Sequence, residues 1–285
     1  MAYHTILAYL PDADSAGRTL KAAAAIARQS GAHLIGLYVK TGVRIYYAGS
    51  SYYDVGMLET MLDEHNARHD EQSAAVKAMF DELERAETFP CEWRLADTVK
   101  TDAVPEILNH CRSADLVVCP NTAGDKTVDP EDADTPVRLL MEAGRPVVVI
   151  PAGWNGDTIG KNVTVAYNAS REATRAVFDA LPLLKGADNV HAVWVDPALG
   201  EGENQSRAAD EIAVSLARHG VKVSASVETS GDNTVARAIV ARARDDGADL
   251  IVMGAYGHMR LREMIFGGVS RDLLNALPLP VLMSH

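Results

Sequence analysis

The sequence predicts an α/β protein made of two tandem, doubly wound, mainly parallel five-stranded sheets with helices on both faces. Short apolar runs typical of buried strands alternate with segments of helical periodicity, which is the order that strand–helix–strand units require. This order occurs twice along the 285 residues, and the two copies end in similar segments. The duplication predicts domains at 1–153 and 157–285, joined by a linker rich in turn-forming residues.

The first copy begins with an apolar strand at 3–10, and Asp14 or Ser15 is a candidate cap for a helix over 19–28. Residues 32–39 form the next strand. A short connection between two such strands predicts a parallel pair with a right-handed crossover.

An insertion follows in the first copy, with four tyrosines between Tyr46 and Tyr53 and then a long helix over about 57–86. Tyrosines in a loop can form a lid or a surface for a partner. They can equally pack the loop onto its own domain. The pattern leaves the role of this loop open.

The second copy repeats the order, with a strand at 162–167, a helix capped by Ser170 and a strand at 190–195. Its closing segments match those of the first copy: 113–119 is similar to 247–253, and 145–150 is similar to 279–283. The chain is therefore predicted to contain two copies of the same domain in tandem.

Composition excludes several function classes. A net charge of −12 and a pI of about 5.2 argue against a nucleic-acid or anionic-membrane surface, because both require a basic footprint. The start of the chain lacks the features of a signal peptide, and no run reaches membrane-spanning length. Three cysteines without metal or redox spacing favour a reduced, cytoplasmic location.

The strongest functional signal is the stretch from Asp249 to Ser270, where a short apolar run precedes one glycine pair and a second pair precedes a helix. Glycines before a helix expose backbone N–H groups, and the helix dipole adds positive potential. In doubly wound sheets, ligands bind beyond the carboxyl ends of the strands. The stretch therefore predicts a phosphate site.

Gly254, Gly257 and Gly267 have the spacing Gly, two residues, Gly, nine residues, Gly. In this the second copy resembles a universal stress protein domain of the ATP-binding kind, and the whole chain resembles a tandem universal stress protein with an adenine nucleotide alpha hydrolase-like fold. The resemblance implies a bound ATP, or ADP or AMP, with Mg²⁺ as an optional companion. It implies an adenosine side at Val165, Ala166, Asn168 and Val195, and a phosphate side at Met253, Gly254, Tyr256, Gly257, Gly267, Gly268, Val269 and Ser270.

Two positions depart from the family pattern. Asn168 replaces the usual Asp, and Gly268 replaces the first hydroxyl residue of the phosphate loop. An amide oxygen can still accept a hydrogen bond from ribose, and Ser270 still offers a hydroxyl. Loss of one neutral hydrogen bond costs about 1 kcal/mol, or about fivefold in affinity, so weaker binding is expected.

The first copy departs further, with Pro120 and Ala123 at the glycine positions and Pro11 at the acidic position. Five carboxylates between 121 and 134 would repel phosphates. The first copy is therefore expected to bind no nucleotide and to pair with the second copy within the chain. A homodimer of the whole chain is a further option.

Enzymatic activity is not expected beyond a slow ATP hydrolysis, because a Walker A motif and a base–nucleophile pair are both absent. Asp249 and His258 offer polar groups around the glycine loop. His65 and His69, four residues apart on a helix, favour a solvated polar face over a metal site.

Two functions follow from the sequence. One is a stress-response regulatory or protective module whose ATP-bound state changes its contacts. The other is a nucleotide-independent scaffold that uses the pseudo-dimeric interface and the tyrosine-rich loop.

Overall fold

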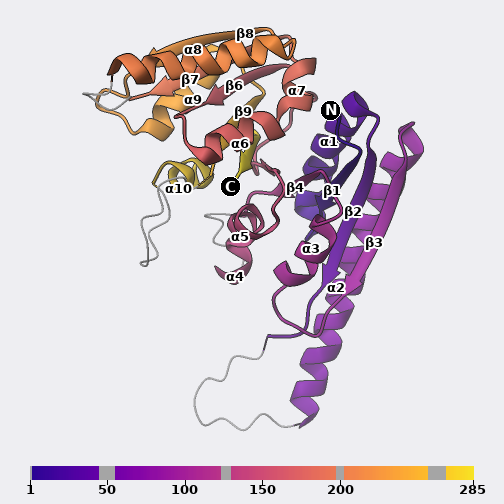
Figure 1. Ribbon diagram of the computed structural model, residues 1–285. Coiled ribbons are helices and arrows are strands. Elements are labelled where there is room, and N and C mark those ends of the chain that lie inside the picture. The colour runs from indigo at the N-terminus through magenta and orange to yellow at the C-terminus, as the bar shows by residue number, and fades with distance from the viewer. Residues whose placement is uncertain (1, 45–54, 123–129, 197–201, 256–267) are drawn as a thin grey trace.

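The computed structural model describes residues 2–44, 55–122, 130–196, 202–255 and 268–285. Ten strands in these residues form one continuous sheet in the order β3-β2-β1-β4-β5-β10-β9-β6-β7-β8, and Figure 1 labels the strands β1–β4 of the first half and β6–β9 of the second. The first half supplies β1 (Thr5–Tyr9), β2 (His33–Lys40), β3 (Cys91–Asp97), β4 (Leu116–Pro120) and β5 (Val147–Ile150). The second half supplies β6 (Asn162–Ala166), β7 (Asn189–Val195), β8 (Val223–Glu228), β9 (Leu250–Gly254) and β10 (Val281–Ser284).

The two halves meet at a pair of antiparallel strands. β10 pairs with β5 in antiparallel orientation, with Leu282 opposite Val148, whereas the pairs within each half are parallel. Both residues are fully buried. The predicted α/β class with mainly parallel strands is confirmed, and the structure adds that the two predicted five-stranded sheets join edge to edge.

Ten helices in the described residues cover the two faces of the sheet. The first core lies under α1 (Ala13–Ser30), α2 (Val55–Ala86), α6 (Arg171–Asp179), α7 (Leu181–Gly186) and α8 (Gly202–Arg218). The second core lies under α3 (Val104–Cys111), α5 (Thr135–Glu142), α9 (Val235–Asp245) and α10 (Gly268–Asn275), and the short α4 (Pro130–Ala133) precedes α5. None of the described helices is long and apolar enough to cross a membrane.

Residue alternation along each strand separates the two cores. In β1, Ile6 and Ala8 contribute to the first core, and Leu7 and Tyr9 contribute to the second. This is the period of two that a sheet with two covered faces requires.

One predicted helix cap is confirmed, and another is wrong. Ser170 caps α6 as predicted, with its hydroxyl accepting from Ala173 N–H. α1 begins earlier than predicted, because Asp12, rather than Asp14 or Ser15, accepts from the Ser15 N–H. Gly31 ends α1 at a φ of 63°, the left-handed conformation that glycine adopts without strain.

Hydrogen bonds between the halves add to the β5–β10 pair. The Asn121 amide donates to the Leu274 carbonyl of α10 at 2.7 Å, and the Tyr3 hydroxyl donates to the Asp179 carbonyl at 2.7 Å. The two halves therefore form one framework. The domain limits at 153 and 157 stay a prediction.

Candidate functional edge

The candidate site lies at the carboxyl ends of β6, β7 and β9. After β6 the chain continues to β7 and β8 on one side, and it then returns to β9 and β10 on the other side. The connections therefore change direction between β6 and β9. This change of direction is the switch point at which ligands bind in open α/β sheets.

The turn from β6 to α6 carries Asn168, whose side chain is exposed. Its amide oxygen accepts from the Ser170 N–H at 3.2 Å and keeps a second lone pair. Ala169, between them, has a φ of 53°. A non-glycine residue in this left-handed region is strained, and such strain is concentrated at functional sites.

A second strained residue lies at the end of β7. Asp196 has a φ of 51° and directly follows the half-buried Val195. The Ser230 hydroxyl and the Ser230 N–H both donate to the Asp196 carboxylate and hold its pKa below the usual value. Among the described residues, Ala169 and Asp196 are the non-glycine residues with positive φ, and both lie at the candidate edge.

Gly254 ends β9 against the first turn of α6. A Cβ atom built on Gly254 would lie 2.3 Å from the Ala173 nitrogen and 2.6 Å from the Glu172 carbonyl carbon. Real Cβ contacts are longer, so β9 and α6 pack this closely only because residue 254 is glycine. Strand–helix packing therefore explains this glycine without a ligand.

α10 begins at Gly268, so the helix predicted after the second glycine pair includes the second glycine of that pair. Val269 packs against the second core, and the Ser270 side chain is buried at 4% exposure. The first turn of a helix leaves N–H groups without intrahelical partners, so α10 places such donors at the predicted phosphate side.

The structure does not bring all of the predicted site residues to one face of the sheet. Ala166, Val195, Met253 and Val269 all contact the second core, on one face of the sheet. Val165 lies on the opposite face, fully buried in the first core. Outside the described residues lie Tyr256, Gly257 and Gly267, together with His258 and the Tyr46–Tyr53 loop.

Asp249 lies at the amino end of β9, at the opposite edge from the candidate site. Its carboxylate accepts from the Gly160 N–H at 2.9 Å, the Lys161 N–H at 3.0 Å and the Asn162 N–H at 3.2 Å. Asp115 does the same for the start of β1 in the first half. The expectation that Asp249 lies beside the glycine loop is therefore wrong, and its role is to hold the start of β6.

In the first half, a cavity of about 400 Å³ adjoins the carboxyl end of β2 and is lined by Arg44, His65, His69 and Asp132 among others. Asp132, one of the five carboxylates noted above, pairs with Arg44 at 2.9 Å. His65 contacts the Thr41 carbonyl at 2.7 Å. Burial, followed by neighbouring cations, lowers the pKa of His69.

His69 Nδ1 lies 2.9 Å from the Tyr38 hydroxyl. Both imidazoles therefore fasten α2 to the end of β2. No group of three metal-ligating side chains occurs in the described ranges.

One polar network has no signal in the sequence. His191 of β7 lies 2.9 Å from Asp246 and 2.9 Å from the Ser226 hydroxyl of β8. Thr164 and Arg242 also donate to Asp246. The members come from four separate segments with no characteristic spacing, so a local motif could not reveal them.

A groove of about 650 Å³ lies between α9 and α10. Its lining includes Thr234 at the start of α9, Arg237 and Asp272, but not Ala166, Asn168 or Gly254. The groove therefore borders the candidate edge without coinciding with it.

Solved structures share this fold over the full chain. A universal stress protein from Archaeoglobus fulgidus DSM 4304 has a TM-score of 0.66 and 18% identity, covering 98% of this chain and 97% of that chain. A putative universal stress protein from Pseudomonas aeruginosa UCBPP-PA14 has a TM-score of 0.58 and 16% identity, covering 99% and 93%. At these identities the likeness shows the fold alone.

A universal stress protein in complex with cAMP matches with a TM-score of 0.32 and 22% identity, covering 54% of this chain and 100% of that chain. A TM-score this low gives no basis for transferring its ligand. A search of curated proteins found no match. The half of the chain that carries the candidate edge, residues 160–285, matches the model of the universal stress protein family.

Proposed function

We propose that the chain is a tandem universal stress protein whose second half binds an adenine nucleotide at the carboxyl ends of β6, β7 and β9. ATP is the proposed ligand, with ADP and AMP as alternatives and Mg²⁺ as an optional companion. The observation that carries the proposal is the switch point between β6 and β9, located in the half that matches the family model. The bound state serves a stress-response regulatory or protective role.

Ala166 and Val195 supply apolar surface on one face of the sheet for the base. Asn168 supplies an exposed amide whose oxygen retains a lone pair for a ribose hydroxyl. The first turn of α10 supplies main-chain N–H groups for the phosphates. Because Ser270 is buried, its side chain serves mainly to seat that turn.

The strained backbone supports a binding role for the edge. Ala169 and Asp196 both adopt left-handed conformations, each of which costs on the order of 1–3 kcal/mol. The Asn168 and Asp196 side chains hold these turns through Ser170 and Ser230. Turns fixed in this way form a binding surface that loses little entropy on binding.

The first half acts as a partner of the second rather than as a second nucleotide site. Pro120 ends β4 where Gly254 ends β9, and the adjacent Asn121 hydrogen-bonds to α10. The same contact, together with the β5–β10 pair, favours a scaffold function as the second candidate. Turnover is at most a slow ATP hydrolysis.

Thermal unfolding with and without ATP tests the proposal. A ligand at a hundred times its Kd stabilises the folded state by about 2.7 kcal/mol. Asn168→Ala should weaken nucleotide affinity about fivefold, the value of one neutral hydrogen bond. Asn189→Ala is the matched control, because Asn189 is an exposed residue that begins β7 at the opposite edge.

No stabilisation by millimolar ATP would refute nucleotide binding and leave the scaffold as the function. Equal losses in the two asparagine variants would place the nucleotide elsewhere. Native mass spectrometry of freshly purified protein would identify a nucleotide that co-purifies.

A further inference from the structure

β8 is the last strand of the sheet, and β7 is its one strand neighbour in the part of the chain that the structure describes (Figure 1). The Val190 N–H donates to the Lys222 carbonyl at 3.0 Å, and the Asp196 N–H donates to the Glu228 carbonyl at 2.9 Å. Alternate residues of a parallel strand bond to the same neighbour. The even-numbered residues of β8 therefore bond to β7, and Val223, Ala225 and Val227 direct their N–H and C=O groups outward.

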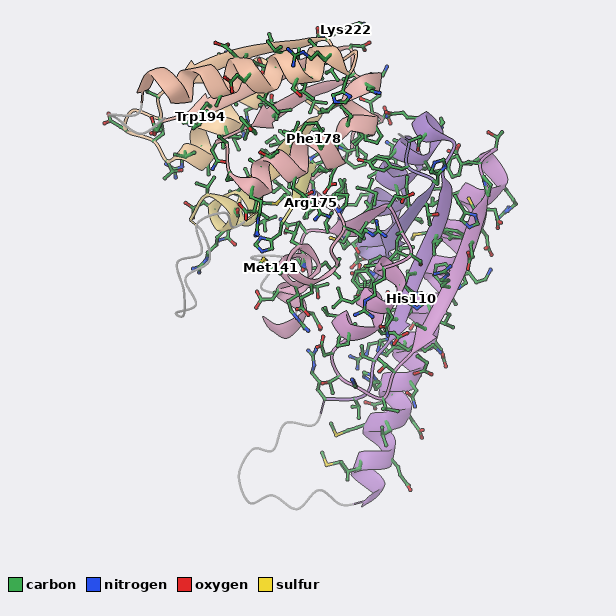
Figure 2. All side chains as sticks on the ribbon, in the orientation of Figure 1. His110, Met141, Arg175, Phe178, Trp194 and Lys222 are labelled. Atoms are coloured by element: carbon green, nitrogen blue, oxygen red, sulfur yellow. The ribbon has the colours of Figure 1, made fainter. Side chains whose placement is uncertain are left out.

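The centre of this open edge lacks the features that normally prevent strand pairing, and charges lie only at its two ends, Lys222 and Glu228. No proline and no charged residue lies between Lys222 and Glu228. Val227 is 43% exposed. Lys222 lies exposed at the upper rim, beside β8 (Figure 2). Charges and prolines protect natural sheet edges, so an edge whose central residues include neither is suited to pairing.

The opposite end of the sheet is different. β3 carries Glu92, Arg94 and Asp97 within seven residues. Arg94 and Glu92 form an ion pair at 2.7 Å along this strand. The two ends of the sheet therefore differ in their fitness for pairing, and β8 is the better candidate.

We propose that β8 pairs in antiparallel orientation with β8 of a second copy of this chain, about a two-fold axis at Ala225. Each Val223 then lies opposite the second copy's Val227, and each Ser224 lies opposite the second copy's Ser226. The outward residues exchange about six main-chain hydrogen bonds across the axis. The exposed Val227 side chain gains an apolar neighbour.

Charge complementarity selects a second copy as the partner. In this register Lys222 lies opposite the second copy's Glu228, twice by symmetry. Both are even-numbered, so they occupy the non-hydrogen-bonded positions, where opposing Cα atoms are only about 4.5 Å apart. A shift of the axis to Ser224 or Ser226 separates the charges and shortens the ladder. The register is therefore specified by the sequence of β8 itself.

Glu228 can make this contact while it keeps its present ones. Its carboxylate pairs with Arg242 at 3.4 Å and accepts from the Ser226 hydroxyl at 3.3 Å, and a carboxylate has lone pairs for a further donor. The chain carries a net charge of −12, which opposes association in general. The opposite charges of Lys222 and Glu228 leave this edge with no net charge, so two acidic molecules can approach each other here.

Sedimentation velocity of the full-length protein at several concentrations tests the pairing. The wild-type chain should dimerise, and Lys222→Glu and Glu228→Lys should each weaken dimerisation at least tenfold. Each variant places like charges opposite one another in its own homodimer. A mixture of the two variants should form a heterodimer, because both cross-strand contacts are then attractive.

Two proline variants test the main-chain part of the proposal. Ala225→Pro removes an outward N–H and leaves the bonds to β7 in place. Leu95→Pro is the matched control on β3, where the Leu34 N–H donates to Pro90 and the Thr98 N–H donates to Lys40, so Leu95 also faces outward. The first variant should be monomeric and the second dimeric, with circular dichroism showing that both are folded.

Three results would overturn the proposal. The first is a wild-type chain that stays monomeric up to about 100 µM, even if the β8 edge binds a different protein. The second is a dimer that survives both Ala225→Pro and the charge variants. The third is a mixture of charge variants that does not associate while each variant stays folded.

Discussion

Gly254→Ala is predicted to destabilise the fold itself, because the space for a Cβ atom is already filled by backbone. The added carbon would lie 2.3 Å from the Ala173 nitrogen, 2.6 Å from the Glu172 carbonyl carbon and 2.8 Å from the Ala173 Cα. These atoms belong to the first turn of α6 and cannot swing aside as a side chain can. β9 and α6 must therefore separate.

The magnitude follows from the packing on either side. Inserting a carbon into a well-packed core costs about 1–3 kcal/mol, and a clash with backbone on three atoms belongs at the upper end. We expect a loss of about 3 kcal/mol, a large part of the 5–15 kcal/mol that holds a typical domain folded. The same variant should then bind ATP poorly for reasons unrelated to phosphate contacts.

Urea unfolding followed by far-ultraviolet circular dichroism measures the effect. Gly17→Ala is the matched control, since Gly17 lies within α1 and a Cβ there would meet nothing within 4 Å. That variant should gain about 0.5–1 kcal/mol, because alanine favours helix over glycine. A Gly254→Ala protein within about 0.5 kcal/mol of wild type would refute the packing argument.

Two further predictions concern titratable groups. Burial alone would raise the pKa of Asp246, but hydrogen bonds from Arg242, His191 and Thr164 outweigh it and lower the pKa. The resulting stability is present above the unfolded-state pKa of about 3.9 and is lost as the pH falls through the lower folded pKa. Asp246→Asn should therefore make the free energy of unfolding depend less on pH in the acid range. An unchanged acid dependence would contradict this. Burial raises the pKa of Cys111 to about 12 and raises that of Cys119 further. In native protein at pH 8, iodoacetamide should therefore label the half-buried Cys91 first, and equal labelling of all three would count against the assigned burial.

The local features of the fold could be read from the sequence, because they depend on neighbouring residues. Ser170 as a helix cap and the repeated Ala-Asp pair before β4 and β9 are examples. The shared pair now has a physical reason, since Asp115 and Asp249 each hold the start of the adjacent strand. Alternation along β6 also implies that Val165 and Ala166 face opposite sides of the sheet.

Features that depend on distant segments could not be predicted. Nothing near Val148 or Leu282 indicates that β5 and β10 pair, since each is simply a buried strand. The sequence predicts that Gly254 approaches a phosphate. In the structure the close neighbour of Gly254 is instead the backbone of α6, about 80 residues away in the chain. His191 and Asp246 are separated by 55 residues, so their contact carried no local pattern.

The join between β5 and β10 has a consequence for attempts to divide the protein. A fragment ending in the linker would expose the fully buried edge of β5. The remaining fragment would expose the edge of β10, and its Leu274 carbonyl would lose the hydrogen bond from the Asn121 amide. Each exposed edge is a short run of Val, Ile, Leu and Met with unpaired main-chain groups, the kind of surface that nucleates aggregation. Either half expressed alone is therefore expected to aggregate through this edge, which in the full chain is covered by the other half.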